Sequence, residues 1–207
     1  MIRASLIFVV AMTASAAIVD GIVATVGRTP ITDSMVRRAL RTAAFLAKTP
    51  LAETAAVWEE TRGRLIEQAL VKEEIRISRY TMAQPDEVRA AMEQIKAQTG
   101  GAPAFAAKLR EYRLTEADLA ENVAWQITFS RFITYRFRPS VQVTDEALRA
   151  FYAQWKPAGE KPAFEAARDL VETEFVAEES ARFLDRWLNE TRQLTRIETL
   201  QPKGVRP

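Results

Sequence analysis

Along most of the chain, apolar residues recur every three or four positions, which is the spacing of one face of an α-helix. The pattern predicts helices over residues 33–48, 53–78, 85–99, 103–112, 116–137, 145–155 and 163–196. Proline, glycine and capping residues mark most of their ends, and Thr115 to Asp118 resembles a capping box. The last helix would span about thirty residues, or roughly 50 Å at 1.5 Å per residue.

Two segments near the start have a different pattern. Ile22–Val26 is rich in β-branched residues, Gly27 and Arg28 form a turn, and residues 30–32 read as a second extended piece. The short segment Ile197–Leu200 is also β-like, and it is the only good candidate partner for this hairpin. The predicted fold class is therefore mostly α, with a small β-sheet formed by the N-terminal hairpin and the C-terminal strand.

The first sixteen residues have the features of an export signal. Met1–Arg3 carries one positive charge, Ala4–Met12 is apolar, and residues 14–16 are small, as a signal peptidase requires. We expect a signal peptide at residues 1–16, export to the periplasm, and only transient contact with the membrane. A retained anchor is the alternative, but a bilayer span needs roughly 20 apolar residues.

The amino-acid composition excludes most common kinds of catalytic site. The 207 residues contain no cysteine and no histidine, so thiol nucleophiles and the commonest general base and metal ligand are missing. We expect no catalytic residues, no metal site and no cofactor. Lys and Arg total 29 against 27 for Asp and Glu, and a mixed surface of this kind does not predict a nucleic-acid partner.

The helix that follows Thr115 carries apolar residues on two sides. One side holds Leu119, Val123, Ile133 and Phe137, and the other holds Trp125, Phe129 and Phe132, with Arg131, Arg136 and Arg138 nearby. Two interpretations stay open. Several helices could pack around this helix and bury both sides, or the aromatic side could form an open groove for apolar segments of another polypeptide.

On the long final helix, the apolar residues also shift from one face to another along its length. Its first half is marked by Phe164, Val171 and Phe175, and its second half by Val176, Phe183, Trp187 and Leu194. Two interpretations stay open: the helix packs against two bodies, or it is a long helix that crosses a single curved bundle.

The succession of elements resembles the SurA-like periplasmic chaperones and foldases. The resemblance rests on VDGIVATVGRTPITDSMVRRAL, RLIEQALVKEEI, VTDEALRAFYAQWK and FEAARDLVETEFVAEESARFLDRWLNE, followed by IETL. It implies that residues 17–207 form one SurA-like chaperone domain. In that domain, residues 17–156 form the N-terminal helical part and residues 163–200 the C-terminal helix and strand.

The family resemblance also implies a function, with one large departure. It implies an ATP-independent chaperone, or holdase, that binds unfolded outer-membrane or secreted polypeptides. Members usually carry one or two parvulin-type prolyl isomerase domains, of about a hundred residues each, before the final helix. Here residues 157–162 stand in that place. We therefore expect no enzyme, and no catalytic residue is carried over from the family.

For client binding we predict an exposed apolar surface at Trp125, Phe129 and Phe132, helped by Phe105 and Tyr112. Nearby arginines would add polar contacts to the client backbone. A structural or assembly subunit that packs on a fixed partner, or on a second copy of itself, is the alternative function. Residual isomerase activity is a third.

Overall fold

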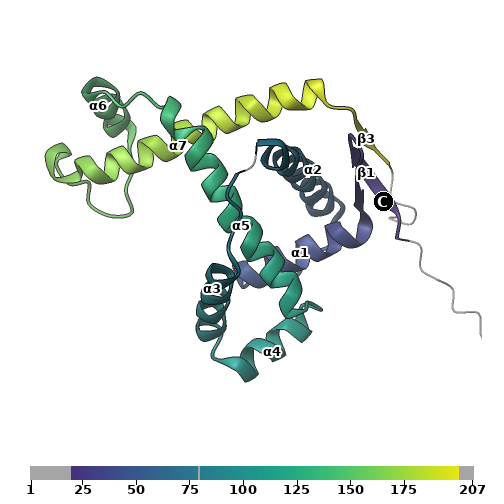
Figure 1. The fold of residues 1–207 in the computed structure, drawn as a ribbon. Coiled ribbons are helices and arrows are strands. Elements are labelled where there is room, and N and C mark those ends of the chain that lie inside the picture. The colour runs from purple at the N-terminus through teal and green to yellow at the C-terminus, as the bar shows by residue number, and fades with distance from the viewer. Residues whose placement is uncertain (1–19, 79, 201–207) are drawn as a thin grey trace, which may run out of the picture.

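The computed structural model describes residues 20–78 and 80–200, so the predicted signal peptide lies outside the described residues. The elements, in chain order, are β1 (Ile22–Val26), β2 (Thr29–Thr32), α1 (Asp33–Ala47), α2 (Ala55–Ser78), α3 (Pro85–Gln98), α4 (Ala102–Glu111), α5 (Glu116–Arg136), a 3-10 turn η1 (Arg138–Ser140), α6 (Asp145–Gln154), α7 (Phe164–Leu194) and β3 (Ile197–Thr199). The fold is mostly α with one small sheet, as the sequence predicts (Figure 1).

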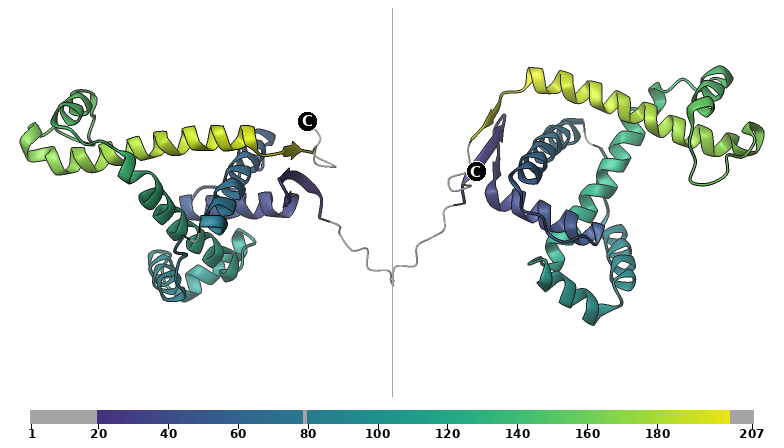
Figure 2. Two further views of the ribbon diagram at one scale, coloured as in Figure 1. Left: turned by 45° about the horizontal axis from the view of Figure 1, so that its top comes forward. Right: turned by 180° about the vertical axis from the view of Figure 1, so that it is seen from behind.

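The sheet joins the two ends of the described chain. Its strand order is β2-β1-β3, and both pairings are antiparallel. The hairpin turns at Gly27, whose φ of +57° lies in the left-handed region that favours glycine. β3 adds to the far side of β1, with Thr25 opposite Glu198 (Figure 2). The predicted pairing of the C-terminal strand with the N-terminal hairpin is confirmed.

Local capping signals set the starts of three helices. The hydroxyl oxygens of Thr32, Thr115 and Thr144 accept bonds from backbone N–H groups three residues later, at 3.1 to 3.4 Å. At Thr115 the Asp118 carboxylate accepts the Thr115 backbone N–H in return at 2.8 Å, which completes the capping box. A cap of this kind typically contributes about 1 kcal/mol. The end of α7 differs slightly from prediction, because Thr195 is already extended and leads into β3.

Three separate hydrophobic cores hold the helices together. The main core lies between the sheet, α1, α2, the second half of α5 and the second half of α7. A second core joins the end of α1 to α3, α4 and the first half of α5. The third, which we call the arm core, is formed by α6 and the first half of α7.

The arm core explains the change of face along α7. Phe164 and Val171 are buried against α6, whereas Leu184 and Leu188 are buried in the main core. Figure 1 shows α7 running from the sheet to α6, past the end of α5. Of the two interpretations of α7, packing against two bodies is the one the structure shows, although Leu194, expected on the second face, is 89% exposed. No helix within residues 20–78 and 80–200 is long and apolar enough to cross a membrane.

Candidate functional site

The aromatic series on α5 forms a continuous stack beside α2 and α7. The rings of Trp125 and Phe129 are nearly parallel, with centroids 5.3 Å apart. Phe129 stacks in turn on Phe132 at 6.4 Å, and Phe132 meets Trp187 of α7 edge-on at 5.7 Å. The predicted aromatic face therefore exists. Its members differ widely in how much surface they expose.

Three of the five predicted binding residues are core residues. Phe132 is fully buried between α5 and α7. Phe105 and Tyr112 lie in the second core, where both rings pack edge-on against Phe45, and the Tyr112 hydroxyl donates to the Thr49 carbonyl at 2.9 Å. The expectation that these three rings are exposed is wrong, because neighbouring helices cover them.

Phe129 is half-buried and lines a groove between α5 and α7. This α5–α7 groove has a volume of about 620 Å³. Its apolar lining is Phe129, Ile133, Val176, Ala177 and Ala181. Serine, threonine and glutamine side chains separate these apolar positions, and Arg138, Asp169 and Glu172 line its charged part. A lining that mixes apolar and polar side chains suits a polypeptide segment, because it takes apolar side chains and still offers partners for a backbone.

Trp125 lines a different hollow, of about 290 Å³, between β2, α1, α2 and α5. Its charged side chains largely pair with one another: Arg38 bonds Asp118 at 3.3 Å, and Arg76 bonds Glu73. Lys72 lies 5.3 Å from the centre of the Trp125 indole. Because its charges are mostly satisfied, this hollow offers fewer free partners than the α5–α7 groove.

The three arginines near the aromatic face have different roles. Arg131 bonds Glu87 and donates to the Met82 carbonyl at 3.0 Å, so it ties α5 to the start of α3. The hydrogen bond from Arg131 holds the pKa of the Glu87 carboxyl below its usual range. Arg136 pairs with Glu74 of α2 at 3.3 Å. Only Arg138 lines the α5–α7 groove. Of the three arginines expected near a client, only Arg138 lies beside this groove, and its contact with a client stays a prediction.

Two features of this surface were missed by sequence reasoning. The α7 wall of the groove depends on Ala177 and Ala181, four residues apart, whose small side chains leave room above Phe129. Two small residues on one helical face are a weak signal that could have indicated it. The second feature is Tyr135, which is 74% exposed and packs edge-on against Tyr80 with ring centroids 5.3 Å apart.

Within residues 20–78 and 80–200, no group of three or more acidic side chains is placed to hold a metal ion. Arginines hold the Glu87 and Asp145 carboxylates in surface ion pairs and keep their pKa values below the usual range. These pairs are structural, and none of them faces the α5–α7 groove.

Comparison with known proteins identifies the fold. No family model and no curated protein matches the sequence. A solved structure from work on the virulence factor PEB4 and the periplasmic protein Cj1289, two structurally related SurA-like chaperones of Campylobacter jejuni, is similar at a TM-score of 0.54. The match covers 88% of this chain and 100% of that chain, with 13% sequence identity. The fold is therefore that of a SurA-like chaperone module.

Proposed function

We propose that this protein is an ATP-independent periplasmic chaperone, a holdase, that binds unfolded outer-membrane or secreted polypeptides in the α5–α7 groove. The observation that carries the proposal is the apolar α5–α7 groove within a SurA-like fold. A periplasmic location agrees with the likeness to SurA-like proteins and with the expected signal peptide.

The chemistry of the groove suits loose, reversible binding. A client side chain placed against Phe129 and Val176 would gain about 25 cal/mol for each Å² of apolar surface removed from water. Ser130, Thr134 and Thr173 lie between the apolar positions and could bond the client backbone irrespective of its sequence. Several weak contacts of this kind allow the client to be released without ATP, because weakly bound segments dissociate quickly by themselves.

We also propose that the chain acts without prolyl isomerase activity. Residues 155–163 join α6 to α7, and within them residues 157–162 stand where a parvulin domain would otherwise be inserted. Contacts at the base of this loop close it onto α6. The Lys161 ammonium donates to the Tyr152 carbonyl at 2.5 Å, and the Tyr152 hydroxyl donates to the Pro162 carbonyl at 2.7 Å. A proline-limited refolding assay with no gain in rate would support this proposal.

The holdase proposal is tested by diluting an unfolded outer-membrane β-barrel protein into buffer without ATP and following aggregation by light scattering. We expect suppression at near-stoichiometric ratios. Ala177→Trp fills the groove from an exposed helical position and should remove about half or more of the suppression, because the client loses contact area. Ala166→Trp, also exposed on α7 but outside the groove lining, is the matched control.

The possible outcomes of this assay distinguish an error in the proposed holdase function from an error in the proposed binding site. Unchanged aggregation with folded wild-type protein would overturn the holdase proposal and make a fixed partner, as for an assembly subunit, the better explanation. Suppression that is equal in the wild type and in Ala177→Trp would keep the function and reject the groove.

A further inference from the structure

The segment from Leu194 to Leu200 reads LTRIETL, and it is complementary to itself. When two copies are laid antiparallel about Ile197, isoleucine meets isoleucine, each Arg196 meets a Glu198, threonine meets threonine and leucine meets leucine. Opposite charges directly across an antiparallel pair stabilise it, whereas like charges destabilise it. The segment contains β3, which lies at an edge of the sheet.

The backbone of β3 has an open edge. The bonds from Gly27 N–H to the Arg196 carbonyl at 2.8 Å and from Leu200 N–H to the Val23 carbonyl at 2.9 Å fix which β3 residues face β1. Hydrogen-bonded positions alternate along an antiparallel pair, so Ile197 and Thr199 point their N–H and C=O groups away from β1. No described residue supplies a backbone partner for these groups.

The opposite edge of the sheet is protected. Ala24 lies opposite Ile31 and Val26 opposite Thr29 in the two-residue hairpin, so Pro30 occupies the outward-facing position of β2. Proline has no N–H to offer to another strand, and it is a common device for blocking sheet edges. The protein therefore blocks one edge and leaves the other able to pair.

We propose that two copies of this chain associate through β3, antiparallel about a two-fold axis at Ile197, and join their three-stranded sheets into one of six strands. The two Ile197 residues would exchange N–H···O=C bonds, and Thr199 of each copy would bond Thr195 of the other. Arg196 and Glu198 would lie at non-hydrogen-bonded positions, where facing side chains come closest. This inference does not depend on the proposed holdase function.

Exposure around β3 agrees with a second copy as the occupant. Leu194 is 89% exposed and Leu200 is 48% exposed, and both belong to the large apolar side chains that remain open to solvent. In the register about Ile197, each Leu200 would lie beside the end of α7 of the second copy, where Leu194 is the last helical residue. The Arg196 side chain is 83% exposed, and among residues 20–78 and 80–200 it bonds only Glu198, two positions along, at 2.8 Å for the Nε atom. It can exchange that bond for the equivalent one across the interface.

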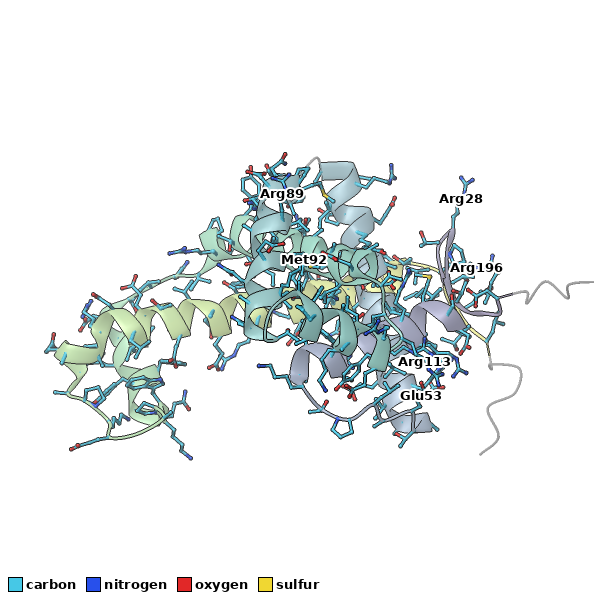
Figure 3. All side chains as sticks on the ribbon, turned by 90° about the horizontal axis from the view of Figure 1, so that it is seen from below. Arg28, Glu53, Arg89, Met92, Arg113 and Arg196 are labelled. Carbon is cyan, nitrogen blue, oxygen red and sulfur yellow. The ribbon has the colours of Figure 1, made fainter. Side chains whose placement is uncertain are left out.

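Charge reversal tests the register in the purified protein. Sedimentation velocity over a range of concentrations should show a monomer–dimer equilibrium. Arg196→Glu or Glu198→Arg alone places like charges opposite each other twice per dimer, and should raise the dimer dissociation constant at least about tenfold. The double variant restores opposite charges and should return within about threefold of wild type. Arg89→Glu, on α3 and away from Arg196 in Figure 3, is the control.

Since the chain contains no cysteine, a single introduced cysteine reports on one position only. Facing residues of a hydrogen-bonded pair have Cα atoms about 5.5 Å apart, within disulfide range. Ile197→Cys should therefore form a crosslinked dimer on mild oxidation, whereas Glu198→Cys, which faces arginine, should not. A protein that stays monomeric at the highest concentrations, or a dimer unaffected by these charge reversals, would overturn the proposal.

Discussion

The hydroxyl oxygen of Thr128, in the middle of α5, accepts a hydrogen bond of 3.0 Å from the backbone N–H of Ala83. Ala83 belongs to the connection between α2 and α3, and Thr128 is only 2% exposed. Three residues further along α5, Arg131 donates to the carbonyl of Met82. Two side chains of α5 therefore hold the backbone of this connection in place.

Thr128→Val should destabilise the protein by about 1–3 kcal/mol, because it keeps the shape of the side chain but leaves the Ala83 N–H without its acceptor. Urea unfolding followed by circular dichroism measures the change. Thr128→Ser keeps the oxygen and serves as the control. Equal stability of the valine variant and the wild type would show that this bond contributes nothing.

Phe132→Ala should cost about 3–5 kcal/mol of stability, because the ring is fully buried in contact with Phe137 and Trp187. Tyr135→Ala, on the same helix and 74% exposed, should change stability by no more than about 0.5 kcal/mol. Thermal unfolding of both variants gives the comparison. Similar losses in the two would contradict the burial assigned to these rings.

The arm, formed by α6 and the first half of α7, should lose stability in acid. Hydrogen bonds from Arg168 and Arg149 lower the pKa of the Asp145 carboxyl. A carboxyl with a lowered folded pKa contributes stability above its unfolded pKa, near 3.9, and loses it as pH falls through the folded value. Asp145→Asn should therefore be less stable than wild type at pH 7, and the difference should become smaller near pH 2.

Urea unfolding at both pH values, followed by circular dichroism, measures this difference; of the four tryptophans, only Trp155 lies in the arm core, so indole fluorescence alone would not isolate it. Glu165→Gln is a useful control, since it removes a carboxylate that bonds Arg149 but not Arg168. If Asp145→Asn differed from wild type equally at pH 7 and pH 2, the ion pairs would not be the cause.

Client affinity should depend more on Phe129 than on Trp125. Phe129 lines the α5–α7 groove, whereas Trp125 lines the smaller hollow beside α1 and α2. Phe129→Ala should weaken binding of a fluorescent peptide from an unfolded β-barrel protein about fivefold, equivalent to about 1 kcal/mol. Fluorescence anisotropy measures it, with circular dichroism to establish folding. A larger loss for Trp125→Ala would move the proposed site to the other hollow.

The helices and the sheet pairing were predictable because their signals are local. Thr32, Thr115 and Thr144 act as caps through side-chain bonds to residues three positions away, and such contacts need no tertiary information. The partner of the hairpin could be predicted for another reason. A two-stranded hairpin needs a further strand, and the sequence contains only one other β-like segment.

The site was harder to predict because α5 is apolar on two sides. Such a helix has no single solvent face, so periodicity cannot say which aromatic rings neighbouring helices will cover. Phe132 and Phe129 lie three residues apart on the same face, yet α7 buries the first and leaves the second half-buried in the lining of a groove. The groove also needs Ala177 and Ala181, which are distant in sequence from both.

The sequence by itself determined where helices begin and end, the minimal sheet and the two-sided character of α5 and α7. It did so because capping, turn formation and hydrophobic periodicity act over a few residues. Only the tertiary structure decided which apolar faces meet: Phe105, Tyr112 and Phe132 became core, and Phe129 remained accessible. That choice depends on contacts between helices far apart in the chain, which no local pattern encodes.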